Sequence, residues 1–219
     1  MAIRPAEARG VFTDGSWLYT RNLVPGVSVY GETLHVQEGV EYRRWDAERS
    51  KLAAYLKKGG RVWPFRDSSS VLYLGAASGT TASHLSDICS VGTILAVEVA
   101  PRSFRDLVAL AETRPNLFPI LADASDPDRY RARLGEADVL YQDVAQRDQE
   151  GIFLRNLVLV RPHGIGFLIV KARSANVASD PARVYRHAED ALRGAGRTVR
   201  DVRVLDPYAK DHAAVVVET

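Results

Sequence analysis

The chain has 219 residues, which suits one full domain or one domain with a small appendage. Hydrophobic residues make up 46% and charged residues 26%, a balance that excludes a wholly disordered chain. No apolar run approaches the roughly 18 residues of a membrane span. The single cysteine, Cys89, excludes an internal disulfide framework and a Cys-built zinc site. Because the first residues lack the apolar stretch of a secretory signal, we expect a cytoplasmic protein with a reduced thiol.

The basic side chains are mostly arginine, with 24 Arg against 5 Lys, while Asn and Gln number only 4 each. This composition fits a protein that works at high temperature, and a GC-rich genome explains it equally well. Residues 1–66 carry 11 Lys or Arg against 7 Asp or Glu, whereas residues 67–219 carry 18 against 20. The basic first third favours a polyanionic partner, but only weakly.

The first part of the chain has the pattern of short antiparallel strands. Residues 11–45 contain an Asp14-Gly15 hairpin signal, a run over 23–30 broken by Pro25-Gly26, and a further run over 33–36. Helix-forming residues follow over 46–58 and stop at Gly59-Gly60. We therefore expect a small N-terminal β module with a linking helix in residues 1–62 and a second domain in residues 63–219.

After residue 70 the pattern becomes strand, turn and helix, repeated. Apolar strands are predicted over 71–74, 93–97, 117–121, 137–141 and 166–170, with helices near 81–90, 102–113, 127–134, 148–160 and 181–194. Such alternation indicates an α/β fold with a parallel sheet covered on both faces. Two further strands, 199–204 and 213–217, are joined by a polar loop without a helix, so we expect them to pair antiparallel. The prediction is a Rossmann-like, seven-stranded, mostly parallel sheet with an antiparallel last strand.

The first loop of this sheet has the character of a ligand-binding loop. The strand over 71–74 runs into Gly75, small residues lead to Gly79, and Thr80 and Thr81 open a helix. Small residues let a ligand approach the backbone, and the helix N-terminus offers free N–H groups. The order Gly75-Ala76-Ala77-Ser78-Gly79 matches neither the dinucleotide fingerprint nor a phosphate loop. A tight turn without a ligand is the alternative reading.

Three carboxylates follow three successive strands: Glu98, Asp123 and Asp143. Glu98 is placed to accept the ribose hydroxyls of an adenosine, and Asp123 to hold its adenine amino group. Each acid alone is explained by a helix cap or a solvated loop. Together, at one sheet edge, they would repel a pyrophosphate and suit a ligand with positive charge. S-adenosylmethionine has a sulfonium, an ammonium and no phosphate, which favours a methyltransferase over a dehydrogenase.

Candidate catalytic residues lie near the same edge. Lys171 ends the fifth strand and Asp143 ends the fourth. Burial disfavours an ammonium and a neighbouring carboxylate favours it, so the pair would orient a reacting hydroxyl more than supply a free base. His212 reaches this edge if the last strand lies inside the sheet. Lys51 is a further candidate, although periodicity alone does not separate it from Lys57 and Lys58. A snorkelling lysine and a surface histidine are the structural alternatives.

Seven segments together resemble archaeal fibrillarins over about residues 11–219. They are YRRWDAERSKLAA (42–54), VLYLGAASGTTASHLSDI (71–88), AVEVAPRSFRDL (96–107), ILADASDP (120–127), YQDVAQ (141–146), IVKARSANV (169–177) and YAKDHAAVV (208–216). GAASGTT, DVAQ and KARS at these spacings are highly specific. The resemblance implies a class I methyltransferase that transfers the methyl group of S-adenosylmethionine to ribose 2′-hydroxyls of rRNA and tRNA, selected by box C/D guide RNA.

The resemblance also implies the site residues. The implied catalytic set is Lys51, Asp143, Lys171 and His212. The implied cofactor-binding positions are Gly75, Ala76, Thr80, Thr81, Glu98, Val99, Asp123, Ala124, Asp143, Val144, Ala145 and Gln146. Val99 stands where relatives usually have an aromatic residue, which would loosen packing against the adenosine. No metal is expected.

Implied partners are the guide and target RNA, a Nop-type scaffold protein and a kink-turn-binding subunit resembling a ribosomal protein. A near-neutral methyltransferase domain should bind RNA poorly by itself, which agrees with dependence on such partners. Two other functions remain open at this point. One is a methyltransferase with another substrate, such as protein, and the other is a non-catalytic subunit of an RNA particle.

Overall fold

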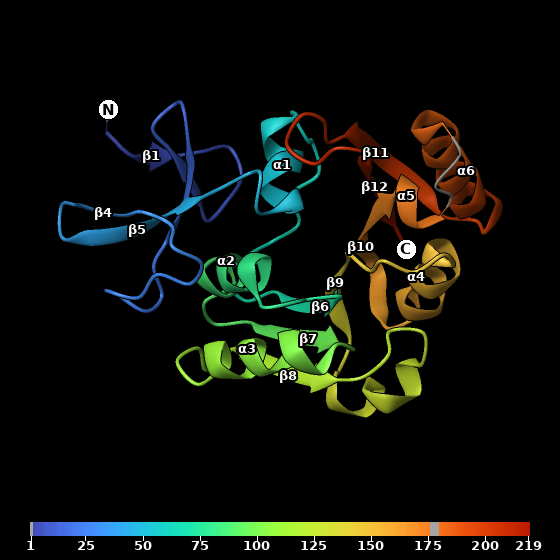
Figure 1. Ribbon diagram of the computed structural model, residues 1–219, viewed down its shortest axis with the longest axis horizontal. Helices are drawn as coiled ribbons and strands as arrows, with labels where there is room; N and C mark the ends of the chain where they lie inside the picture. Colours follow the sequence, from blue (N-terminus) through green and yellow to red (C-terminus); the bar gives the residue numbers. More distant parts are fainter. Residues whose placement is uncertain (1, 176–179) are drawn as a thin grey trace.

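The computed structural model describes residues 2–175 and 180–219, and within them the chain forms two sheets (Figure 1). The N-terminal sheet is antiparallel and five-stranded, in the order β1-β2-β3-β5-β4. Its strands are β1 (Arg4–Pro5), β2 (Val11–Thr13), β3 (Leu18–Arg21), β4 (Leu34–Gln37) and β5 (Val40–Trp45). The predicted antiparallel module is therefore confirmed.

The predicted strand over 23–30 is wrong, because this segment is a series of bends. A turn at Pro25-Gly26 is closed by the N–H of Val27 on the carbonyl of Val24, at 3.1 Å. The Glu32 carboxylate then accepts the N–H groups of Val29 and Tyr30. A side chain thus takes the backbone donors that a neighbouring strand would otherwise bind.

The second sheet has seven strands in the order β11-β12-β10-β9-β6-β7-β8. They are β6 (Ser70–Leu74), β7 (Thr93–Glu98), β8 (Leu117–Leu121), β9 (Ala137–Gln142), β10 (Val160–Lys171), β11 (Thr198–Val204) and β12 (His212–Glu218). Strands β6 to β10 pair in parallel, and β12 runs antiparallel to both of its neighbours, β10 and β11. The predicted fold is confirmed, and β12 lies inside the sheet.

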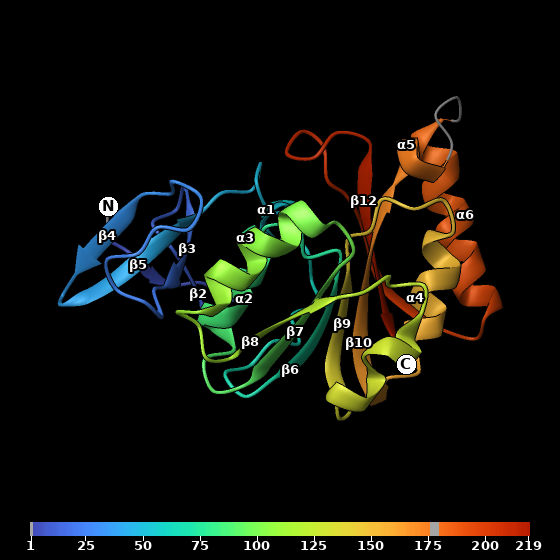
Figure 2. The same cartoon turned by 60° about the horizontal axis from the view of Figure 1, so that its bottom comes forward.

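Helices cover both faces of this sheet (Figure 2). The first face carries α1 (Lys51–Lys57), α2 (Thr80–Ile88) and α3 (Pro101–Ala111), and the second carries α4 (Gln149–Leu157) and α6 (Pro181–Gly194), while the short α5 (Ala172–Ala175) follows β10. Side chains alternate along each strand: Val71 and Tyr73 pack towards the first face, Leu72 and Leu74 towards the second.

Two predicted helices differ from those observed. Residues 127–134 form two short 3₁₀ helices, Pro127–Arg129 and Arg131–Arg133, instead of one α-helix. The predicted helix over 148–160 ends at Leu157, since the long strand β10 already starts at Val160. Of the segment 169–177, the last two residues lie outside the described residues.

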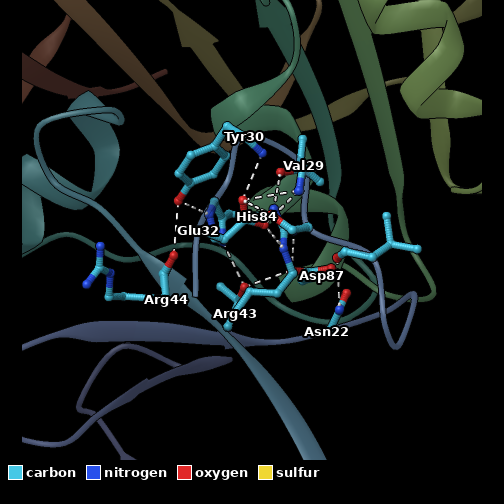
Figure 3. A network of polar contacts seen from close by, with 12 residues as sticks. Asn22, Val29, Tyr30, Glu32, Arg43, Arg44, His84 and Asp87 are labelled. Carbon is cyan, nitrogen blue, oxygen red and sulfur yellow. Dashed lines mark hydrogen bonds and ion pairs between the residues drawn. The ribbon is translucent and has the colours of Figure 1, made fainter. Parts of the chain in front are cut away.

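A buried polar network joins the N-terminal sheet to α2 (Figure 3). Arg43 of β5, with no exposed surface, pairs with Glu32 at 2.7 Å and with Asp87 of α2 at 2.8 Å. Arg114 binds the other oxygen of Asp87 at 2.6 Å. Buried charges are stable only when paired, so this network fixes the N-terminal sheet against the helix that begins at the ligand loop. The expected division into residues 1–62 and 63–219 stays a prediction.

In the part of the chain that the structure describes, no helix combines the length and apolarity needed to cross a membrane.

Candidate active site

The ligand loop is shaped by Gly75 and Gly79. Gly75 follows β6 with a φ of +78°, and a Cβ built there would lie 2.7 Å from the carbonyl oxygen of Asp143. Gly79 precedes α2 with a φ of +93° and packs against Leu110. Both positions therefore require glycine, because a side chain would be strained and would push the loop away from β9 and α3. The loop ends with the N–H groups of the first turn of α2 free of helical partners.

A cavity of about 270 Å³ lies at the carboxyl edge of β6, β7 and β9. Eight of the twelve positions predicted to bind the cofactor line it: Gly75, Glu98, Val99, Ala124, Asp143, Val144, Ala145 and Gln146. The sequence reasoning did not name four other lining residues for this role: Ala77, Val97, Ala122 and Lys171. Ala77 carries a sequence signal, since it lies inside the small-residue loop, and its φ of +49° is a left-handed conformation that is uncommon for a residue with a side chain.

The carboxylate of Glu98, at the end of β7, is held by hydrogen bonds from backbone N–H groups. One Glu98 oxygen accepts the N–H of Ala77 at 2.8 Å, and the other accepts those of Val99 and Ala100 at 2.9 and 2.7 Å. Glu98 is 8% exposed and borders the cavity. Each carboxylate oxygen has two lone pairs, so the oxygen that binds only Ala77 can also accept a hydroxyl donor of a ligand.

Asp123 lies just beyond β8, and its carboxylate is also held by neighbours. The N–H of Ser125 donates to Oδ1 at 2.8 Å, and Gln146 donates to the same oxygen at 3.3 Å. These hydrogen bonds, with that of Ser125 as the largest cause, hold the pKa of Asp123 below its usual 3.8. The group is therefore a negatively charged acceptor at neutral pH.

Asp143 binds two lysines from distant parts of the chain. The Nζ of Lys171, at the end of β10, lies 2.8 Å from Oδ1 and donates to the backbone carbonyl of Asp143 at 2.8 Å. The Nζ of Lys51, from the first residue of α1, lies 2.9 Å from Oδ2. The three side chains are 11% to 25% exposed. One carboxylate thus fixes two ammonium groups at the cavity edge, which no sequence pattern could show for Lys51.

His212 begins β12 directly opposite Lys171 in the sheet register. Its Nδ1 lies 2.6 Å from the carbonyl oxygen of Lys210, so the Nδ1–H donates there and the Nε2 lone pair stays free. Burial, reinforced by the charges of Lys51 and Lys171, lowers the pKa of His212 below 6.5, although the Lys210 carbonyl and Asp143 oppose this. The ring is therefore neutral at neutral pH and can accept a hydrogen bond.

Four of the predicted cofactor positions do not line the cavity: Ala76, Thr80, Thr81 and Asp123. Ala76 belongs to the core under the loop, and Thr80 opens α2. The Thr81 hydroxyl lies 2.9 Å from that of Ser50, which caps the N-terminus of α1. This contact ties the start of α1 to the start of α2 and so places Lys51 beside Asp143.

Comparison with known proteins agrees with this geometry. The family model described as Fibrillarin matches residues 4–219. The fibrillarin-like rRNA/tRNA 2′-O-methyltransferase of Saccharolobus solfataricus is 48% identical over 208 residues, which cover 94% of this chain and 90% of that protein. Fibrillarin of Aeropyrum pernix, solved with natively bound S-adenosyl-L-methionine, superposes with a TM-score of 0.91 at 44% identity and covers 99% of this chain and 98% of that one. A fibrillarin in complex with Nop5p superposes with a TM-score of 0.89 at 37% identity, covering 97% and 99%. The chain belongs to the fibrillarin family.

Proposed function

We propose that this chain binds S-adenosylmethionine in the cavity between the ligand loop and the ends of β7 and β9. The acceptor groups fit that molecule: Glu98, which lines the cavity, offers a carboxylate oxygen to ribose hydroxyls. Asp123, which lies beyond the lining residues, is proposed to accept the adenine amino group. Gly75 keeps the loop close to the backbone of Asp143, where a Cβ would fill the space. The Aeropyrum pernix relative, 44% identical, binds the same cofactor.

The chain is an RNA ribose 2′-O-methyltransferase that acts on rRNA and tRNA, the substrates in the names of its curated relatives. The observation that carries this proposal is the arrangement of Lys51, Asp143 and Lys171 at the cavity edge, with His212 opposite Lys171. S-adenosylmethionine supplies an electrophilic methyl group. A ribose hydroxyl is a poor nucleophile, so the chain must aim it and stabilise the negative charge that develops as its proton leaves.

The four side chains divide this work. The Lys171 ammonium, held by two contacts to Asp143, orients the hydroxyl and stabilises the developing alkoxide. Asp143 positions both lysines, one at each of its carboxylate oxygens. Lys51 holds the adjoining phosphate as a cation, and His212 accepts the hydrogen bond of the hydroxyl at its free Nε2, where it is placed to take up the hydroxyl proton.

We further propose that the chain works in a box C/D particle in the cytoplasm. A Nop-type scaffold protein is the first partner, in line with the relative solved with Nop5p. Guide RNA, target RNA and a kink-turn-binding subunit complete the particle. Charge supports this dependence, because residues 67–219 carry 18 Lys or Arg against 20 Asp or Glu and so attract a polyanion weakly. Within the chain itself, we propose two domains, residues 1–62 and residues 63–219.

The test reconstitutes the chain with a scaffold protein, a kink-turn-binding protein, a box C/D guide and a complementary target. Labelled S-adenosylmethionine should place its methyl group on the ribose that the guide specifies. Label on protein instead would favour a methyltransferase with another substrate. Cofactor binding without any transfer in the complete mixture would favour a non-catalytic subunit.

A further inference from the structure

Strand β9 ends earlier than its neighbour β10, and the last residue of β10 is Lys171, the proposed catalytic lysine. The two strands pair as far as Leu168 and Gln142, and β10 continues three residues further to Lys171. The backbone N–H of the following residue, Ala172, points towards β12 and donates to the carbonyl of Asp211 at 3.0 Å. Since neighbouring residues of a strand point their backbone groups to opposite sides, those of Lys171 face the side that β9 has left.

The side chain of Gln149 takes the place of the missing strand. Its Oε1 accepts the N–H of Lys171 at 2.7 Å, and its Nε2 donates to the carbonyl of Lys171 at 3.2 Å. Gln149 is the first residue of α4 and has no exposed surface. A buried backbone group without a partner is costly, so this two-point contact holds the main chain of Lys171 on the side that β9 has left, while β12 holds the other side.

The same glutamine is tied to the other half of the ion pair. The side chain of Gln142, also fully buried, donates to the backbone carbonyl of Gln149 at 2.7 Å. Gln142 directly precedes Asp143. One chain of amide contacts therefore runs from the residue before Asp143, through Gln149, to the backbone of Lys171. It links the two main-chain segments whose side chains meet at 2.8 Å.

We infer that Gln149 is a positioning residue for methyl transfer: its amide sets the backbone of Lys171 relative to Asp143, and so sets the distance and direction of the Lys171 ammonium. This inference rests on the proposed function for its catalytic consequence. Its structural part stands on the contacts alone. Gln149 does not line the cavity and binds only the backbone of Lys171, so it should affect turnover and leave cofactor affinity unchanged.

The test compares Gln149→Met, which keeps a long unbranched side chain but cannot make both hydrogen bonds, with Asn116→Leu. Asn116 is a matched control because its buried amide also makes two hydrogen bonds to the backbone, in this case by donating to the carbonyls of Ser86 and Cys89, away from the site. Both variants are brought to conditions under which calorimetry shows each fully folded. The comparison then separates lost stability from lost positioning.

The first readout is amide exchange, which needs no activity. The chain has five lysines, so ¹⁵N-lysine labelling gives five backbone amide signals. The signal that is missing from the spectrum of Lys171→Arg belongs to Lys171. In Gln149→Met the Lys171 amide should exchange at least about tenfold faster, as expected when a hydrogen bond is lost. The Lys58 amide, bonded to the carbonyl of Ala54 at 2.9 Å, should be unchanged. Unchanged protection of Lys171, or an equal rise in Asn116→Leu, overturns the inference.

The second readout is turnover in the assembled particle. Displacing a catalytic group by about 1 Å lowers rates by up to ~100-fold, so kcat of Gln149→Met should fall about 10- to 100-fold. The dissociation constant for S-adenosylmethionine should stay within twofold, and Asn116→Leu should turn over like the wild type. Equal turnover of the two variants overturns the inference. An inactive wild type would instead contradict the proposed function, and amide exchange would then decide the role of Gln149.

Discussion

Replacing Arg43 with methionine tests whether the buried network fixes the N-terminal sheet to α2. Arg43 loses its ion pairs at 2.7 Å to Glu32 and 2.8 Å to Asp87, together with a hydrogen bond to Ser83 at 2.9 Å. Asp87 keeps its ion pair with Arg114. The buried Glu32 carboxylate keeps only the N–H groups of Val29 and Tyr30 and the hydroxyl of Ser28 as hydrogen-bond donors. Breaking a buried pair from one side costs about 3–5 kcal/mol, because an uncompensated charge remains.

The expected change is large enough to measure by calorimetry. For a chain of this length each kcal/mol shifts Tm by roughly 2–4 °C, so Arg43→Met should lower Tm by about 6–20 °C. The control is Arg193→Met, which removes an exposed arginine paired with Glu189 within α6. Such a surface pair contributes about 0–1 kcal/mol. If the two variants melt within 2–3 °C of each other, the reasoning about the network is refuted.

Three further predictions concern the same structure. Burial, with the charges of Arg43 and Arg114, lowers the pKa of His84 well below 6.5. As pH drops below roughly 6.5, the unfolded chain takes up a proton at this histidine and the folded protein does not, so the free energy of unfolding should fall by up to about 1.4 kcal/mol per pH unit. Calorimetry should find a smaller decline in His84→Asn. Gly75→Ala should weaken S-adenosylmethionine binding at least about tenfold by titration calorimetry, because its Cβ would contact the Asp143 carbonyl at a φ of +78°; unchanged affinity would contradict the account of the loop. Lys171→Ala should lower methyl transfer at least ~100-fold with cofactor binding retained, and near-normal turnover would exclude its proposed role.

The sheet was predictable because most of its strands are short and apolar, and helix-forming segments separate most of them. The carboxyl ends of parallel strands share one edge, so Glu98 and Asp143 were expected to meet there, and both border the cavity. His212 was expected at that edge only if its strand lay inside the sheet. Strand β12 does lie between β10 and β11, and His212 stands opposite Lys171.

Other features could not be read from the sequence, because they depend on contacts between distant segments. Helical periodicity did not separate Lys51 from Lys57. In the fold, Lys51 binds Asp143, whereas Lys57 donates to the carbonyl of Ser16. Likewise Arg43 and Arg44 are adjacent in the chain, yet only the first is fully buried in an ion-pair network. The backbone of Lys171 depends on a glutamine 22 residues earlier, which no local pattern marks.

The most direct test of the central claim is guided methyl transfer itself. The purified chain is mixed with labelled S-adenosylmethionine, a box C/D guide, its complementary target and the two partner proteins, and the target is mapped nucleotide by nucleotide. Label is expected on the single ribose that the guide specifies, and it should be lost when the guide is omitted and in Lys171→Ala. Label that persists in Lys171→Ala, or no label although the cofactor is bound, would contradict the central claim.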